Sequence, residues 1–258
     1  MAHEFDGKRY EKASAHQQEW GRKLISELDL KGNEWVLDLG CGDGSLTAQI
    51  AELLPEGEVI GIDASQGMID AARPRTTKNL RFLLRDIDDL DFEDAFDVVF
   101  SNAALHWVKD HEKLLHKVRR ALQPEGRVRF NFAGHGNCMA FFRVIREVMA
   151  IESFNPYFSS FEWPWYMPSV DEYSALAASS GLWNPEVWGE NADRYFPDKE
   201  TMIRWIDQPS LVPLLPYIPE KEKQAFRDAV VQRMIEETLQ PDGRCFETFR
   251  RINLSATK

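Results

Sequence analysis

The sequence predicts an α/β fold in which helices cover both faces of a doubly wound, mostly parallel sheet. Two observations indicate this class. Short apolar segments alternate with helical patterns about every 25 residues in the first half of the chain, and a glycine-rich turn follows the first apolar segment. Such alternation is typical of parallel strands joined by right-handed crossovers. The 258 residues suffice for one such domain with additional segments.

The first half of the chain supplies the expected core elements. Residues 14–29 place Trp20, Leu24, Ile25 and Leu28 on one face of a helix. The expected strands are 34–39, 59–62, 80–84, 96–100 and 127–132, and the expected helices are 45–54, 66–73 and 110–122. We therefore expect a single catalytic domain over 1–258, with an N-terminal helical cover over 1–29 and a ligand-binding core over 30–135.

After residue 136 the alternation stops. Helical patterns occupy 138–151, 170–180, 198–207 and 219–239, and extended patterns occupy 184–196 and 245–255. The segment 154–166 has seven aromatic residues in thirteen, which indicates burial against protein or substrate. We expect the last core strands within 182–196 and 244–256. Helical insertions over 136–181 and 197–243 are expected to form a lid over the carboxyl ends of the strands.

Composition restricts the partners and the compartment. A formal net charge of -11 repels phosphate backbones, so we expect no nucleic-acid partner. Cys41, Cys138 and Cys245 are too few and too scattered for a disulfide framework or a zinc site. The N-terminal residues lack the apolar core of a signal peptide, and no apolar run reaches the ~18 residues of a membrane helix. We expect a cytoplasmic protein without a membrane partner, either monomer or dimer.

The strongest local signal is the glycine loop Asp38-Leu-Gly40-Cys41-Gly42-Asp-Gly44, which follows a strand and opens a helix. Glycines let the backbone turn sharply and approach a ligand closely, and the helix N-terminus favours a negative or polar group. The dinucleotide fingerprint would need glycine at position 45, where this chain has serine. The alternative is a tight turn that binds no ligand.

Polar residues follow the next three strands. Asp63 ends the second strand, about 20 residues past the glycines, where a carboxylate can accept both hydroxyls of a ribose. Asp86 and Ile87 follow the third strand and could edge an adenine ring. The segment from Ser101 to Trp107 follows the fourth strand. With the strand order 3-2-1-4-5, the glycine loop and the loop of His106 would face each other across the crevice where the order reverses.

In these motifs the chain resembles the class I S-adenosylmethionine (SAM) methyltransferases. The segments DLGCGDG, GIDAS, RDI, FSNAALHW and ALQPEGRV follow the order of that family's motifs over about residues 30–135. The resemblance implies a Rossmann-like seven-stranded sheet whose last strand is antiparallel, with SAM as cofactor and S-adenosylhomocysteine as product. The cofactor-binding residues that it implies are Asp38, Gly40, Cys41, Gly42, Asp63, Ala64, Met68, Asp86, Ile87, Ser101, Asn102 and Ala103.

The stretch SNAALHW, followed by HEKLL, is most similar to the trans-aconitate and juvenile hormone acid methyltransferase type, which methylates carboxyl oxygens of small molecules. We therefore expect methyl transfer to a small-molecule acceptor, preferably to a carboxylate or hydroxyl oxygen. Ser101-Asn-Ala-Ala104 stands where N-methylating relatives have an Asn-Pro-Pro-Tyr type sequence. No metal site is expected, because His111 and His116 are five residues apart and do not share a helix face.

His106 is the expected catalytic residue, either as a general base or as a group that orients the acceptor; the alternative is that it only packs. The candidate substrate contacts are Tyr10, Trp20, Trp107 and Arg143, although aromatic residues at helical spacing commonly pack in a core. Arg146, Arg194 and Arg204 are further candidates for binding a carboxylate. Two other functions stay open, a protein or RNA methyltransferase and a non-catalytic SAM-binding protein.

Overall fold

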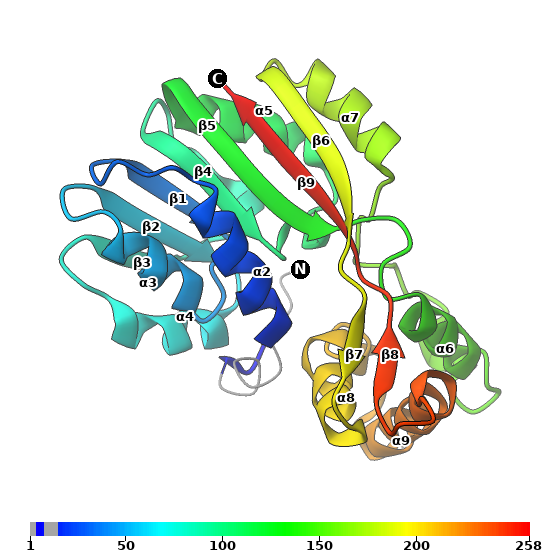
Figure 1. Cartoon of the computed structure of the whole chain (residues 1–258). Helices are drawn as coiled ribbons and strands as arrows, with labels where there is room; N and C mark the ends of the chain where they lie inside the picture. The colour runs from blue at the N-terminus through cyan, green and yellow to red at the C-terminus, as the bar shows by residue number, and fades with distance from the viewer. Residues whose placement is uncertain (1–3, 8–14) are drawn as a thin grey trace. The chain divides into compact units, whose positions relative to one another are not determined.

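The computed structural model describes residues 4–7 and 15–258, which form two compact units (Figure 1). The sheet unit comprises the described residues up to His135 together with Trp165–Glu190 and Arg251–Lys258. The helical unit comprises Gly136–Pro164 and Asn191–Arg250. In the described part of the chain, no helix is long and apolar enough to cross a membrane.

The sheet unit is built on seven strands in the order β3-β2-β1-β4-β5-β9-β6. Their bounds are β1 Trp35–Leu39, β2 Glu58–Asp63, β3 Leu80–Leu84, β4 Phe96–Asn102, β5 Leu122–Ala133, β6 Trp183–Asn191 and β9 Arg250–Thr257. Strands β1 to β5 pair in parallel, and β9 pairs antiparallel with β5. The predicted doubly wound sheet with an antiparallel last strand is confirmed.

Helices cover both faces of this sheet, with α2 and α3 on one face and α5 and α7 on the other (Figure 1). The α-helices of the unit are α2 Ala15–Ser26, α3 Ser45–Glu52, α4 Gln66–Ala72, α5 His111–Ala121 and α7 Val170–Ser179. Short 3-10 turns are η1 Arg73–Arg75, η2 Ile87–Asp89 and η3 Leu105–Trp107.

Two apolar cores follow from the period-two alternation of the strands. Val36 of β1 packs with Leu24 of α2 and Ile50 of α3 on one face. Leu37, its neighbour in β1, packs on the other face with Leu114 of α5. Because both faces are covered, the central strands carry nearly continuous apolar sequences, which is typical of parallel sheets.

The helical unit contains a two-stranded antiparallel sheet of β7 (Arg194–Phe196) and β8 (Cys245–Glu247). Its helices are α6 Met139–Met149, α8 Lys199–Trp205 and α9 Glu220–Thr238, with shorter helical turns η4 Asn155–Phe158, η5 Ile206–Ser210 and η6 Leu215–Tyr217. The buried carboxylate of Glu247 accepts the backbone N–H groups of Ala140 and Phe141 at 3.2 and 2.9 Å, and so caps α6.

The second half of the chain differs from the sequence-based expectation in where its segments go. The extended segment 184–196 divides into β6 in the large sheet and β7 in the small one, and 245–255 divides likewise into β8 and β9. The insertion expected over 136–181 also divides. Tyr173 and Ala177 of α7 are fully buried in the core on the α5 face, so this amphipathic helix belongs to the sheet unit. The expectation that the insertions form a lid stays a prediction.

The aromatic run 154–166 is divided in the same way. Phe154 and Phe158 pack on Phe226 of α9 in the helical unit, with ring centroids 5.2 and 5.4 Å apart. Trp165 and Tyr166 pack in the sheet unit, against Trp107 at 5.6 Å and His111 at 4.6 Å. Each unit therefore buries part of the run in its own interior.

Candidate cofactor and acceptor site

The candidate site lies at the carboxyl ends of the parallel strands. The strand order confirms that β1 and β4 are neighbours. β2 and β3 lie beyond β1 on one side, and β5, β9 and β6 lie beyond β4 on the other. In doubly wound sheets, ligands bind in the crevice at this reversal point. All twelve cofactor-binding residues expected from the sequence lie at the carboxyl ends of β1, β2 and β4 or in the segments that follow β1, β2, β3 and β4.

The glycine loop turns through three residues with left-handed backbone angles. Gly40, Gly42 and Gly44 have φ of 73°, 56° and 76°, a region that other residues adopt at a cost. A Cβ atom on Gly40 would lie 2.2 Å from the Cβ of Ala104, and one on Gly44 would lie 2.6 Å from the ring of Phe82. A Cβ atom on Gly42 would meet nothing within 4 Å. Gly40 and Gly44 thus permit packing, whereas Gly42 borders open space.

Asp63 is bound to the glycine loop by backbone hydrogen bonds. Its carboxylate oxygens accept the N–H of Gly42 at 3.0 Å and the N–H of Ser65 at 2.9 Å. The N–H groups of Gly40 and Cys41 both donate to the carbonyl of Ile62, each at 2.9 Å. Burial raises the pKa of Asp63, and these two hydrogen bonds oppose the rise. The loop and the strand-end carboxylate therefore form one hydrogen-bonded structure.

Asp38 is a buried carboxyl group behind the same loop. One oxygen accepts the hydroxyl of Thr47 on α3 at 2.7 Å. The other oxygen is buried, and the described part of the chain offers it no hydrogen-bond partner. Burial raises the pKa of Asp38 to about 7, and the nearby charge of Asp63 adds to the rise. Burial also raises the pKa of the Cys41 thiol, so this cysteine stays protonated at neutral pH.

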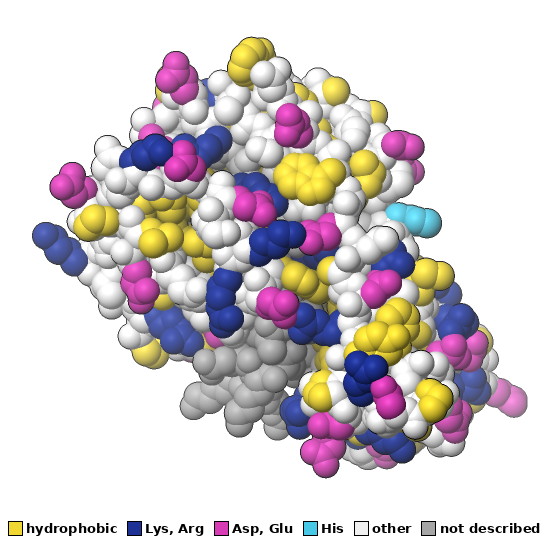
Figure 2. Space-filling view, in the orientation of Figure 1, with side chains coloured by type: hydrophobic (Ala, Val, Ile, Leu, Met, Phe, Trp, Pro, Cys, Tyr) yellow, Lys and Arg dark blue, Asp and Glu magenta, His cyan; other side chains and the backbone are white. Residues whose placement is uncertain are grey.

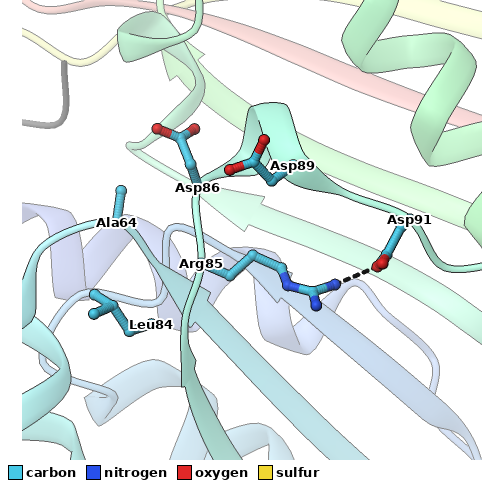
Figure 3. Close-up of a pocket in the computed structure, with 6 residues that line it drawn as sticks. All are labelled: Ala64, Leu84, Arg85, Asp86, Asp89 and Asp91. Carbon is cyan, nitrogen blue, oxygen red and sulfur yellow. Dashed lines mark hydrogen bonds and ion pairs between the residues drawn. The ribbon is translucent and has the colours of Figure 1, made fainter.

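A pocket of about 460 Å³ opens beside the ends of β2 and β3 (Figure 3). Ala64 and Asp86 line it, which brings two of the expected cofactor residues together. Figure 3 shows the carboxyl groups of Asp86 and Asp89 on the same side of the loop, while Arg85 pairs with Asp91. Asp86 also caps η2 through the N–H of Asp88 at 3.0 Å. Two further expected cofactor residues are buried in the segments that follow these strands: Ile87 is the first residue of η2, and Met68 lies in the first turn of α4.

An N-terminal segment reaches this site through Glu4 and Phe5, two residues that the sequence analysis did not single out. The carboxylate of Glu4 accepts the N–H groups of Gln66 and Gly67 at the start of α4, at 3.2 and 2.6 Å. The ring of Phe5 lies 5.7 Å from that of Trp107. Residues 4–5 thus extend from the loop after β2 to the loop after β4. No local sequence pattern could predict this contact, because Glu4 and the start of α4 are 62 residues apart in the sequence.

The loop after β4 is fixed at its base. The Ser101 hydroxyl donates to the Leu39 carbonyl at 2.7 Å, and the Asn102 amide donates to the Gln17 carbonyl at 2.9 Å. The side-chain carbonyl oxygen of Asn102 is buried, and no described residue donates to it. Ala103 has a left-handed φ of 58°, a conformation that costs a non-glycine residue about 1–2 kcal/mol. Such strain is concentrated at functional sites.

His106 lies half-buried in η3, and its Nδ1 atom is buried with no partner in the described part of the chain. Burial lowers the pKa of His106 to about 3, and the positive charge of Arg251 contributes. The imidazole is therefore uncharged at neutral pH. Because its conjugate acid is so strong, it is also a weak proton acceptor.

His111 holds η3 in place from α5. Its Nε2 lies 2.9 Å from the Leu105 carbonyl and its Nδ1 lies 3.1 Å from the Tyr173 hydroxyl. The carbonyl needs a donor, so Nε2 carries the proton and Nδ1 accepts from the tyrosine. The Tyr166 N–H donates to the His106 carbonyl at 2.8 Å. His111 thus links the β4 loop to α7 through two hydrogen bonds.

The expected substrate contacts have different locations. Tyr10 lies outside the described residues. Trp20 of α2 and Trp107 of η3 both belong to the sheet unit, with Trp107 packed on Trp165. Arg143 belongs to the helical unit, where it forms an ion pair with Glu237. Arg146 stacks over Trp163 at 4.8 Å, and Arg204 donates to Thr201.

The sequence analysis missed one arginine at this edge of the sheet. Arg251 is buried at the start of β9, in the sheet unit. The sequence shows it only as one of two adjacent arginines in the extended segment 245–255. Its place beside the β4 loop depends on the register of the antiparallel strand, which the sequence does not show. Over the described residues, no group of three His, Cys, Asp or Glu side chains could hold a metal ion.

Comparisons with known proteins agree with this architecture. Residues 30–150 match a family described as a methyltransferase domain. The trans-aconitate 2-methyltransferase of Shigella dysenteriae serotype 1 is 28% identical over 237 residues, 92% of this chain and 91% of that relative. The YcgJ protein of Bacillus subtilis shares the fold with a TM-score of 0.64 and 17% identity, covering 93% of this chain and 98% of that one.

A further solved structure is phosphoethanolamine N-methyltransferase 2 of Haemonchus contortus in complex with SAM. It has a TM-score of 0.60 and 20% identity, covering 98% of this chain and 56% of that one. The fold, the matched domain and the curated relatives together support a class I SAM-dependent methyltransferase. Several curated relatives within this class are named trans-aconitate 2-methyltransferase, which confirms the resemblance seen in the motifs.

Proposed function

We propose that this enzyme transfers the methyl group of SAM to an oxygen atom of a small-molecule acceptor, with a carboxylate favoured over a hydroxyl. The observation that carries the proposal is the environment of His106. Its pKa of about 3 makes it a poor base, and a carboxylate needs no base before it attacks. A phenol or an amine would need one. The relatives named trans-aconitate 2-methyltransferase support a carboxylate acceptor independently.

The glycine loop is proposed to hold the cofactor. Gly42 leaves a space that a Cβ atom would fill. Behind the same loop, one carboxyl oxygen of Asp38 is buried and has no hydrogen-bond partner among the described residues. Asp63 would bind the ribose hydroxyls, and the pocket lined by Ala64 and Asp86 would receive the base. These features fit SAM, which supplies an electrophilic methyl group when bound.

The protein's own contribution is proposed to be positioning. The hydrogen bonds from Ser101, Asn102 and Ala103 fix the β4 loop, so His106 has a defined place at the crevice. An uncharged imidazole there can orient an acceptor oxygen through Nδ1 or Nε2. Holding two reactants in line can lower the activation free energy by up to about 7–11 kcal/mol.

Surface charge supports a small acceptor over nucleic acid. The chain has a formal net charge of -11. On the face shown in Figure 2, acidic and basic side chains are interspersed, and basic side chains form no continuous stripe. A nucleic-acid surface would require such a concentration of positive charge.

Replacing Gly42 by alanine tests the glycine loop. We expect SAM affinity to fall at least about tenfold, because the new methyl group would occupy the space proposed for the cofactor, while the left-handed φ costs only about 1–2 kcal/mol of stability. Gly40→Ala should instead destabilise the fold, since its Cβ would overlap that of Ala104. Calorimetric SAM titration and thermal unfolding of both variants check this. Unchanged SAM affinity in Gly42→Ala would remove the loop from the cofactor site.

SAM binding should release a proton from Asp38. This carboxyl group has a pKa of about 7, so it is partly protonated in the ligand-free protein at neutral pH. A bound cation favours the charged carboxylate, so SAM affinity should rise with pH up to about pH 7–8, by at most about tenfold per unit, and level off above. Titrations in buffers of different ionisation enthalpy measure the proton release. Asp38→Asn should abolish it; release of equal size in that variant would assign the proton to another group.

Turnover against a panel of small acids, phenols and amines tests the proposed reaction. The panel should include trans-aconitate, with methylated product and S-adenosylhomocysteine both measured by mass spectrometry. We expect a methyl ester from at least one acid. Methylation confined to amines would contradict the oxygen acceptor, and the absence of any small-molecule product with intact SAM binding would favour a macromolecular or non-catalytic role.

A further inference from the structure

A buried arginine lies at the carboxyl edge of the parallel strands. Arg251 stands opposite Ala133, the last residue of β5. Because β9 runs antiparallel to β5, its first residues lie where the parallel strands end, at the edge that carries the β4 loop. The side chain has long methylene and guanidinium groups, yet the residue is only 4% exposed. The guanidinium is therefore enclosed in the sheet unit, at the edge that carries the β4 loop.

A ladder of hydrogen bonds fixes the guanidinium from behind. Arg251 Nε donates to the side-chain oxygen of Asn131 at 2.8 Å, and Nη2 lies 3.3 Å from the Asn131 carbonyl oxygen. The Asn131 amide donates to the Asn253 side-chain oxygen at 2.9 Å. Arg129 donates to the same oxygen at 3.0 Å and to Glu27 at 2.7 Å. These five residues form the Asn131 ladder, which holds the Arg251 guanidinium in one orientation.

The ladder joins Arg251 to the loop that carries His106. The Asn131 carbonyl that accepts from Arg251 also accepts the N–H of Ala103 at 2.7 Å. Arg251 is near enough to His106 for its charge to act on the imidazole. Its guanidinium also lies over the ring of Trp20, 4.6 Å from the ring centroid. A cation, an aromatic face and the catalytic candidate therefore meet at one place in the sheet unit.

Several buried polar atoms around this place have no hydrogen-bond partner in the described part of the chain. They are His106 Nδ1, the side-chain oxygen of Asn102 and the side-chain oxygen of Gln17. Buried polar atoms are nearly always hydrogen-bonded, so each such atom indicates a ligand or water that completes it. Asn102 donates to the Gln17 backbone at 2.9 Å, which places these two residues together beside the β4 loop.

We propose that Arg251, oriented by the Asn131 ladder, determines acceptor specificity by binding a carboxylate group of the small-molecule acceptor. This inference rests on the proposed function, because the acceptor must enter the crevice beside His106. The guanidinium fork matches a carboxylate in shape and can bind it through two parallel hydrogen bonds. Trp20 would support the guanidinium plane, and His106 and Asn102 would contact the other polar atoms of the acceptor.

The test compares Arg251→Gln and Arg251→Lys with the wild type on the acid that turns over fastest in the panel. Arg251→Gln should raise KM for that acid roughly 10- to 100-fold, with a smaller change in kcat, because a charge-assisted hydrogen bond is lost. Arg251→Lys should raise KM less, since it keeps the charge and loses the fork. The affinity for S-adenosylhomocysteine should not change in either variant.

Arg127→Gln is the matched control. Arg127 is an arginine of β5 that stands opposite Thr257, the last residue of β9, and donates to the Leu28 carbonyl, so its replacement should keep the wild-type KM. A purely structural role would lower the unfolding temperature, S-adenosylhomocysteine affinity and kcat of Arg251→Gln together, and would raise KM no more for acids than for uncharged acceptors. That result, or an unchanged KM, overturns the proposal.

A second readout separates this proposal from the proposed function. Calorimetry can measure trans-aconitate binding to the protein saturated with S-adenosylhomocysteine, in the wild type and in Arg251→Gln. If the wild type gives no turnover but binds the acid, and Arg251→Gln does not, the reaction fails and the binding residue stands. Equal binding in both proteins, or no binding in the wild type, overturns the role of Arg251.

Discussion

Asp63→Asn is expected to weaken SAM binding about 10- to 150-fold, which corresponds to the loss of charge-assisted hydrogen bonds worth about 1.5–3 kcal/mol. The carboxylate lies at the end of β2, accepts the N–H of Gly42, and is proposed to accept the ribose hydroxyls. Asparagine keeps the size but carries no charge, and one of its two terminal atoms is a donor that cannot accept the N–H groups of Gly42 or Ser65. Calorimetric titration with SAM gives the affinity, and circular dichroism confirms that the variant is folded.

Asp97→Asn is the control for this substitution. Asp97 is also a strand aspartate that accepts a backbone N–H, from Trp35 at 2.7 Å, but it lies near the amino ends of β1 and β4. Its replacement should leave SAM affinity at the wild-type value. Equal affinity in the wild type and Asp63→Asn would show that the strand-end carboxylate does not bind the cofactor.

His106→Asn is expected to lower kcat/KM about 10- to 100-fold through the loss of an orienting hydrogen bond, with little effect on SAM affinity. With SAM at saturating concentration, so that the pH dependence of SAM binding does not enter, the pH profile of the wild type should be flat above about pH 5, because the pKa of His106 is about 3 and the imidazole is already uncharged there. Only below that range should protonation of the imidazole reduce activity. Steady-state kinetics between pH 5 and 9 on the fastest acid check both statements.

His116→Asn provides the comparison, since His116 is exposed on α5. It should match the wild type at every pH. A wild-type profile that rises through pH 6–7, and that is lost in His106→Asn, would instead identify His106 as a general base. Wild-type kcat and KM in the variant would leave only a packing role for the imidazole.

The cofactor half of the site could be predicted because its signals are local. Asp38, the glycines and Asp63 each lie at a strand end, and strand ends in a parallel α/β sequence meet at one edge of the sheet. The alternation that predicts the strands also predicts where their carboxyl ends lie. Asp63 contacts Gly42 across 21 residues, the length of a single βα unit and the strand that follows it.

The acceptor half could not be predicted in the same way. Arg251 contacts Asn131 across 120 residues, and the contact depends on the antiparallel register of β9 against β5. No spacing in the sequence records that register. Arg143 was a candidate because a carboxylate acceptor would need a cation; the structure places it in the helical unit, where the guanidinium pairs with Glu237, and its role stays a prediction.

Electrostatic environment was likewise hidden from the sequence. The residue types left His106 open as a general base, as a group that orients the acceptor or as a packing residue, because histidine ordinarily titrates near neutral pH. Burial in η3 and the charge of Arg251, both set by tertiary packing, move its pKa far from that value.

The division of 184–196 and 245–255 between two sheets was also hidden from the sequence. Each segment has one continuous extended pattern, although its two ends pair with different strands.

A crystal structure of the protein with S-adenosylhomocysteine tests the central claim most directly. The account predicts electron density along the glycine loop, with both ribose hydroxyls on the carboxylate of Asp63, the base in the pocket lined by Ala64 and Asp86, and the sulfur atom facing the loop of His106. Density for the nucleoside away from Asp63, or a sulfur atom directed away from the β4 loop, would contradict it.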